Sequence, residues 1–77
     1  MKDPASEARR ANSDYKAALE GMALVEESIA SVLAMLAEEL SQQGQPETAD
    51  MLQQAGHHHR SASIKSRALA ASLLVAD

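Results

Sequence analysis

Cysteine is absent from this chain of 77 residues, and aromatic residues are nearly so, since Tyr15 is the only one. The lack of cysteine excludes disulfide bonds and thiolate metal sites. A chain of this length buries only about 60% of its unfolded surface, and proteins this small are usually stabilised by disulfides, a metal or oligomerisation. With disulfides excluded, the sequence indicates self-association, a metal held by His and carboxylate side chains, or both.

An excess of basic residues is also missing. The formal net charge is −4, whereas a nucleic-acid-binding surface is basic. The longest weakly charged stretch, Ala68 to Ala76, is far shorter than the roughly 20 residues that span a bilayer. The first residues, MKDPASEARR, lack the apolar core of a signal peptide. We therefore expect a cytoplasmic protein that binds neither nucleic acid nor membranes.

The residues that are abundant, chiefly Ala, Leu, Glu, Gln, Met and Ser, favour helix over sheet. Asp3-Pro4 is a typical helix start, with Ser13 as an alternative. Gly44 suits the position after a helix end and Pro46 the first turn of the next helix. The sequence thus predicts a single helical-hairpin domain over residues 1–77, with helices at about 4–43 and 46–75 and a turn at 44–45. Whether residues 1–11 are ordered is left open.

Each predicted helix carries an apolar stripe whose members alternate steps of three and four. The first stripe reads Tyr15, Leu19, Met22, Glu26, Ile29, Leu33, Leu36, Leu40, and the second reads Leu52, Ala55, His59, Ala62, Ser66, Leu69, Leu73. We expect these stripes, Tyr15 and the methionines to form the core. Glu26 and His59 stand where a leucine would be expected, and a carboxylate there is costly unless something pairs with it.

A turn centred on Gly44 determines which residues of the two stripes face each other. Leu33 then faces Leu52, and Glu26 and His59 fall within about one helical turn of the same layer. Two amphipathic helices bury only part of each other, so we expect a homodimer or higher homo-oligomer that forms an antiparallel four-helix bundle. A two-fold axis would bring two Glu26 and two His59 side chains into one central layer.

The segment Ala23 to Ile64 resembles a ferritin-like hairpin of the rubrerythrin type. The resemblance rests on a mid-helix Glu ahead of residues 36–40, which read LAEEL, followed by Gly44, Glu47 and Ala49. It implies metal binding, with iron first and zinc or manganese next, and iron oxidation or storage as the activity. It also implies Glu26 as a first-helix ligand, with Glu27 as the competing register.

The second ligand motif of that family, Glu-x-x-His, is not complete in this chain. His59-x-x-Ala62 stands in its place, or His58-x-x-Ser61 one residue earlier. This departure favours a mononuclear site, a different metal, or no metal.

Two functions follow as hypotheses. The first is a small metal-binding protein with its site at a dimer interface, for which the candidate ligands are Glu26, His59, Glu27 and His58. The second is a non-enzymatic oligomerisation or interaction module, with a larger protein partner as a further option, in which the layer of Glu26 and His59 sets register and partner choice. We identify no activated serine nucleophile. Enzymatic activity is left open, and any activity would be redox chemistry on a bound metal.

Overall fold

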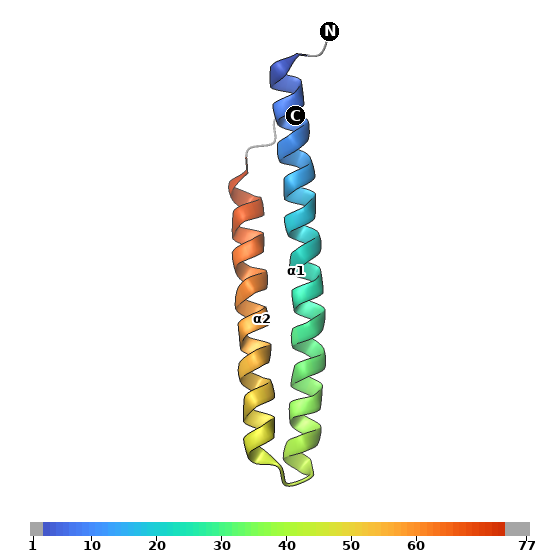
Figure 1. Cartoon of the computed structure of the whole chain (residues 1–77), viewed down its shortest axis with the longest axis vertical. Coiled ribbons are helices and arrows are strands. Elements are labelled where there is room, and N and C mark those ends of the chain that lie inside the picture. Colours follow the sequence, from blue (N-terminus) through green and yellow to red (C-terminus); the bar gives the residue numbers. More distant parts are fainter. Residues whose placement is uncertain (1–2, 74–77) are drawn as a thin grey trace.

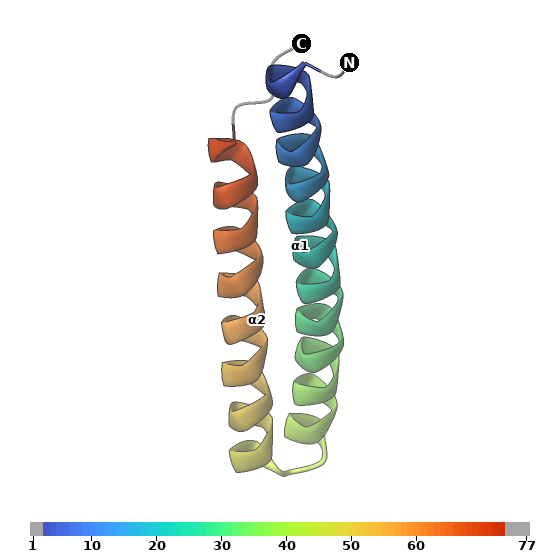
Figure 2. The ribbon, with the colours of Figure 1, turned by 45° about the horizontal axis from the view of Figure 1, so that its top comes forward.

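The structure is a computed structural model that describes residues 3–73. Two α-helices, α1 (Pro4–Gln42) and α2 (Pro46–Ser72), run antiparallel and pack side by side along the whole of α2 (Figures 1 and 2). The molecule is a thin rod of 65 × 15 × 15 Å. No strand occurs within residues 3–73. The prediction of an all-helical hairpin is confirmed.

Local chemistry accounts for the helix ends. The Asp3 side chain accepts a hydrogen bond from the Ala5 amide at 3.2 Å, which caps α1. Gly44 has φ of 77°, a left-handed conformation that glycine adopts without steric cost, and it follows the Gln43 cap of α1. Pro46 begins α2 as expected. α2 ends at Ser72, and the backbone of Leu73 after it is extended. The rest of the predicted extension of α2 to residue 75 lies outside the described residues.

The N-terminal part of α1 projects beyond the last residue of α2 (Figure 1). α1 has 39 residues and α2 has 27, so α2 leaves the first turns of α1 without a helix beside them. Residues 3–11 are all exposed. This projecting segment is nevertheless helical from Pro4 onwards.

The two helices meet through small side chains. Apart from Leu19, every buried residue of the described chain is alanine, glycine or serine. They recur every seven residues, a heptad spacing that keeps them on one line of each helix. On α1 the small residues are Ala23, Ala30 and Ala37, and on α2 they are Ala49, Gly56, Ser63 and Ala70. A Cβ atom placed on Gly56 would lie 3.6 Å from the Ala30 carbonyl oxygen, so the backbones approach closely here.

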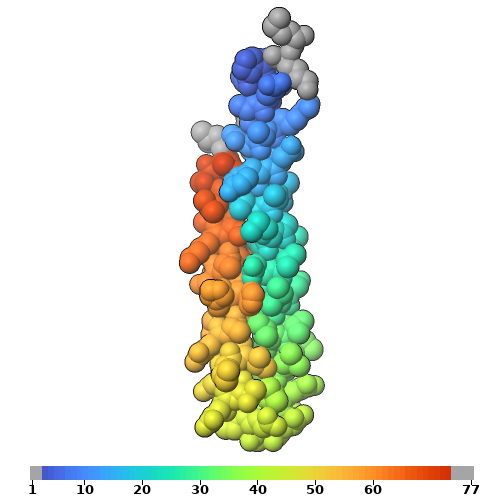
Figure 3. Space-filling model, viewed as in Figure 1, coloured from blue at the N-terminus to red at the C-terminus, as the bar shows by residue number. Residues whose placement is uncertain are grey.

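The expectation that Tyr15 and the methionines form the core is wrong for the described residues. Tyr15 is 54% exposed and Met22 is 55% exposed, and Met35 and Met51 are still more exposed. The small residues between the helices leave no space there for large side chains. Figure 3 shows the two helices in contact along their length, with larger side chains projecting from the sides of the rod.

Most of the predicted stripes therefore lie beside the helix contact, although Leu19 is buried in it and Leu33 lies next to Gly56. Glu26 and His59 touch each other on one side of the contact, and helix geometry places their neighbours at three and four residues on the same side. We call this side the apolar face. Its exposed members on α1 are Tyr15, Met22, Ile29 and Leu36, its half-buried leucines are Leu33, Leu40 and Leu52, and α2 adds Ala55, Ala62 and Leu69.

Candidate functional site

Glu26 and His59 form a side-chain pair at the centre of the apolar face. Oε2 of Glu26 is hydrogen-bonded to Nδ1 of His59, and the two side chains are 28% and 31% exposed. Each residue comes from the middle of its helix, so the antiparallel packing of α1 on α2 fixes their meeting. The prediction that these two residues share a layer is confirmed.

The atoms used in this pair determine what chemistry it can do. A carboxylate on one ring nitrogen of histidine fixes the orientation and tautomer of the ring, as outer-shell carboxylates do behind metal-bound histidines. With Nδ1 occupied, Nε2 is the nitrogen of His59 that a ligand or a second copy of the chain would meet. Glu26 thus acts as the partner that orients His59.

The described residues of one hairpin do not bring together a complete set of metal ligands. Within residues 3–73, no group of three or more His, Cys, Asp or Glu side chains is placed to hold an ion. Structural metal sites need about four protein ligands and catalytic sites about three. Any cation at Glu26 and His59 would therefore require further ligands from another molecule.

Glu27, the competing candidate, lies on the opposite side of the helix contact and has other partners. Its Oε1 accepts from Nε of Arg67 at 2.8 Å, and its Oε2 accepts from Nη2 of Arg67 at 2.9 Å, a two-point contact. Oε1 also accepts from the buried Ser63 hydroxyl at 3.0 Å. The Arg67 hydrogen bonds, with a smaller effect from Ser63, lower the pKa of Glu27, and the same bonds raise the pKa of Arg67.

This second cluster was not anticipated from the sequence. Ser63 and Arg67 are four residues apart on α2 and so share a face, which is a signal that the sequence does contain. Their link to Glu27 requires knowledge of which side of α1 each glutamate occupies. The turn register alone does not give that information.

The remaining candidate, His58, is exposed, as is His57. The ring of His58 meets the ring of His59 edge-on, with centroids 5.9 Å apart and planes at 74°. Three consecutive histidines point in different directions on a helix, and only His59 faces Glu26.

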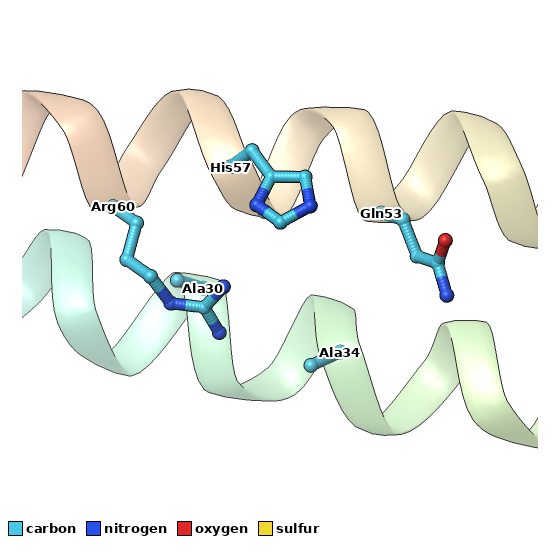
Figure 4. Close-up of a pocket in the computed structure, with 6 residues that line it drawn as sticks. Ala30, Ala34, Gln53, His57 and Arg60 are labelled. Atoms are coloured by element: carbon cyan, nitrogen blue, oxygen red, sulfur yellow. The ribbon is translucent and has the colours of Figure 1, made fainter.

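A shallow hollow lies on the side opposite the apolar face. Figure 4 shows Gln53, His57 and Arg60 of α2 over Ala30 and Ala34 of α1, and Gly56 completes the lining. The hollow exists because the lining residues at the helix contact are small. It holds one imidazole and one guanidinium but no carboxylate, hydroxyl or thiol, so it lacks an arrangement for acid–base or nucleophilic catalysis.

Comparisons with known proteins add no assignment, because no family model, no curated protein and no solved structure matches this chain. No helix within residues 3–73 is long and apolar enough to cross a membrane. The site is therefore interpreted from its own geometry.

Proposed function

We propose that this chain is a helical self-association module in which two hairpins pair through their apolar faces to form a four-helix bundle. The observation that carries the proposal is the apolar face itself. Four large residues, Tyr15, Met22, Ile29 and Leu36, recur along α1 every seven residues with at least 38% of their surface exposed. A heptad repeat of apolar residues is the pattern by which helices pack on one another.

The area of the hairpin supports the same proposal. Its accessible surface is 5815 Å², whereas a folded protein of 8.2 kDa exposes about 4,500 Å² by the usual scaling with mass. The excess of roughly 1,300 Å² exceeds the ~800 Å² that each partner buries in a standard interface. A second hairpin packed on the apolar face would therefore reduce the exposed surface of each copy to about the area expected for its mass.

The Glu26–His59 pair has a role in this assembly as the polar layer of an otherwise apolar contact. Such a layer contributes little net stability, because desolvation offsets the attraction between the two groups. It does disfavour alternative registers, since a shifted register would bury the pair against leucines. We assign it the function of fixing how the two copies align.

Mass measurements on matched variants test the proposal. Wild type is expected to be a dimer by sedimentation equilibrium, with a dissociation constant that Ile29→Glu raises by at least about 100-fold, because a buried unpaired charge costs several kcal/mol. Met35→Glu is the control, since Met35 is 68% exposed and lies off the apolar face. A monomeric wild type, or equal effects of the two substitutions, would contradict the proposal.

A second candidate function is metal binding between the two copies, in keeping with the ferritin-like resemblance. The specific observation in its favour is the Nδ1 contact with Glu26, which leaves Nε2 of His59 toward the second copy. Two Glu26 and two His59 side chains would give four oxygen and nitrogen donors, suited to iron, zinc or manganese. Glu27 would not take part, because Arg67 and Ser63 occupy it.

Elemental analysis of untagged protein tests this candidate. We expect one or two metal ions per dimer in wild type and loss of metal in Glu26→Ala and His59→Ala. Glu27→Gln should keep its metal, which makes it a matched control. Metal content that is unchanged in Glu26→Ala, or absent from the wild-type dimer, would rule this candidate out and leave the first proposal standing.

A further inference from the structure

The charged side chains of the hairpin are separated along its length. From residue 17 to residue 59 the chain has no lysine or arginine. On α1 this stretch runs from residue 17 to the turn, and on α2 it runs from the turn to residue 59 (Figure 1). Its acidic residues near the turn are Glu38, Glu39, Glu47 and Asp50, all exposed.

The described cations lie on the first four turns of α1 and on α2 from residue 60 onwards. They are Arg9, Arg10, Lys16, Arg60, Lys65 and Arg67. Among these cations, Arg67 forms an ion pair with Glu27. The turn end of the molecule is therefore acidic, whereas the start of α1 mixes its cations with Asp3, Glu7, Asp14 and Glu20.

We propose that the two copies pair with their turns at opposite ends of the bundle, so that the start of α1 of each hairpin, with Arg9, Arg10 and Lys16, lies beside the acidic turn of the other. This inference rests on the self-association proposed above and specifies its geometry. The alternative pairing, with both turns at one end, would place two sets of four carboxylates side by side without a nearby cation.

The apolar face is suited to this arrangement because it is nearly symmetric about Glu26. Tyr15 and Met22 precede Glu26 on α1, and Ile29 and Leu36 follow it at almost equal spacing. A two-fold axis through the Glu26 layer, perpendicular to the rod, superimposes the first half of this stripe on the second half of its copy. Met22 of one copy then lies near Ile29 of the other.

In the same arrangement, the projecting start of α1 lies beside the turn of the other copy. Arg9 and Arg10 lie about as far before Glu26 as Gln43 lies after it, so they reach the level of the other copy's turn. There they meet the surroundings of Glu39 and Glu47. Exposed charges interact over about 10 Å at ordinary ionic strength. The attraction therefore requires only that the two ends lie at the same level, and it does not require individual ion pairs.

Distances between labels on the two copies distinguish the two arrangements. The chain has no cysteine, so Gln42→Cys introduces a single labelling site at the end of α1. With turns at opposite ends, two spin labels at this site should lie roughly 45–50 Å apart, from the ~1.5 Å rise per residue along the helices between them. Leu24→Cys, near the Glu26 layer and 59% exposed, is the control and should give the same distance, well below about 45 Å, in either arrangement.

Charge reversal provides an independent test. Glu38→Lys/Glu39→Lys removes the net negative charge of the turn end, and Arg9→Glu/Arg10→Glu makes the opposite end acidic. Each variant alone should dissociate at least about tenfold more readily than wild type. An equimolar mixture should form a heterodimer at wild-type affinity, because the substituted turn of one variant then lies beside the substituted start of α1 of the other.

The outcomes separate this inference from the proposal on which it rests. A monomeric wild type overturns both. A wild-type dimer in which labels at position 42 lie within about 30 Å overturns only the opposite-end arrangement, and so does a mixture that shows no preference for heterodimers. Labels at 45–50 Å together with heterodimer formation support it.

Discussion

Glu26 and Glu27 are adjacent in sequence, yet they belong to different surfaces. A helix turns about 100° per residue, which is enough to place the two carboxylates on opposite sides of the small-residue contact with α2. Glu26 thus meets His59 on the apolar face, and Glu27 meets Arg67 and Ser63 on the other side. As candidate ligands, Glu26 and Glu27 differed only by one residue of helix register. The contacts show that Glu26 lies on the apolar face and Glu27 on the opposite side.

The Glu27 cluster gives a pH prediction. Arg67 holds the pKa of Glu27 in the folded chain below its value of about 4.3 in the unfolded chain. A depressed folded-state pKa contributes stability above the unfolded pKa, and that stability is lost as pH falls through the folded value. We therefore expect the melting temperature to fall as the pH is lowered from about 5 toward 3.

Glu27→Gln is the variant that checks this assignment, because it removes the titrating group and keeps the shape. Its melting temperature should be lower than that of wild type at pH 7 and should depend less on pH in the acidic range. All melts need the same protein concentration, since association also shifts the midpoint. A variant whose acid dependence equals that of wild type would show that other carboxylates are responsible.

At the scale of the helices, the sequence predicts the boundaries better than the contact between them. Asp3-Pro4, Gly44 and Pro46 act through local backbone chemistry, and the structure places the helix ends beside them. The contact was harder to predict because its residues are alanine, glycine and serine, which carry little hydropathy signal. The leucine stripe gave the stronger periodic signal, and half of it turned out to lie on the open side.

The sequence nevertheless contains a repeat of small residues that could have predicted the helix contact. Ala23, Ala30 and Ala37 recur at seven-residue spacing, and Ala49, Gly56, Ser63 and Ala70 recur in the same way on the second helix. Small residues let two backbones approach, and this allowed Glu26 and His59 to touch. The pairing of those two residues followed from the turn position alone and did not depend on recognising the repeat.

Substitutions at Gly56 test the size limit of the contact. Gly56→Ala should raise the free energy of unfolding by about 0.5–1 kcal/mol, because alanine favours helix and the added Cβ lies 3.6 and 3.7 Å from its nearest atoms, an ordinary contact. Gly56→Leu should instead lower it by ~1–3 kcal/mol, because the larger side chain forces the helices apart. Urea denaturation measures both changes.

Gly21 provides the matched control for this series. It lies in α1, and a Cβ added there has no atom within 4 Å. Gly21→Ala and Gly21→Leu should therefore both be stabilising, by up to about 1 kcal/mol. If leucine is tolerated equally at both glycines, the close approach at Gly56 does not limit the side chains that the helix contact accepts.

At the scale of the whole molecule, the hairpin has no interior that could stabilise it in the way a globular core does. Among the described residues, none of the large side chains is fully buried, and Leu19, at 5% exposure, is the only buried leucine. The hydrophobic contribution of its remaining large residues is available only on association. Folding and dimerisation are therefore expected to be coupled, so that the melting temperature rises with protein concentration.

The double substitution Glu26→Leu/His59→Leu separates stability from specificity in that assembly. Replacing a buried polar pair by apolar residues of similar size is often neutral or stabilising by about 1–4 kcal/mol, so the variant should melt at or above the wild-type temperature. Without the polar layer, the leucine face no longer penalises shifted or larger assemblies. Sedimentation should then show several species, and labels at position 42 should give a broad distribution of distances.

A variant that remains a single dimer with the wild-type distance would contradict this role. The apolar residues and the charged ends alone would then fix the alignment, and the Glu26–His59 pair would have no part in setting the register.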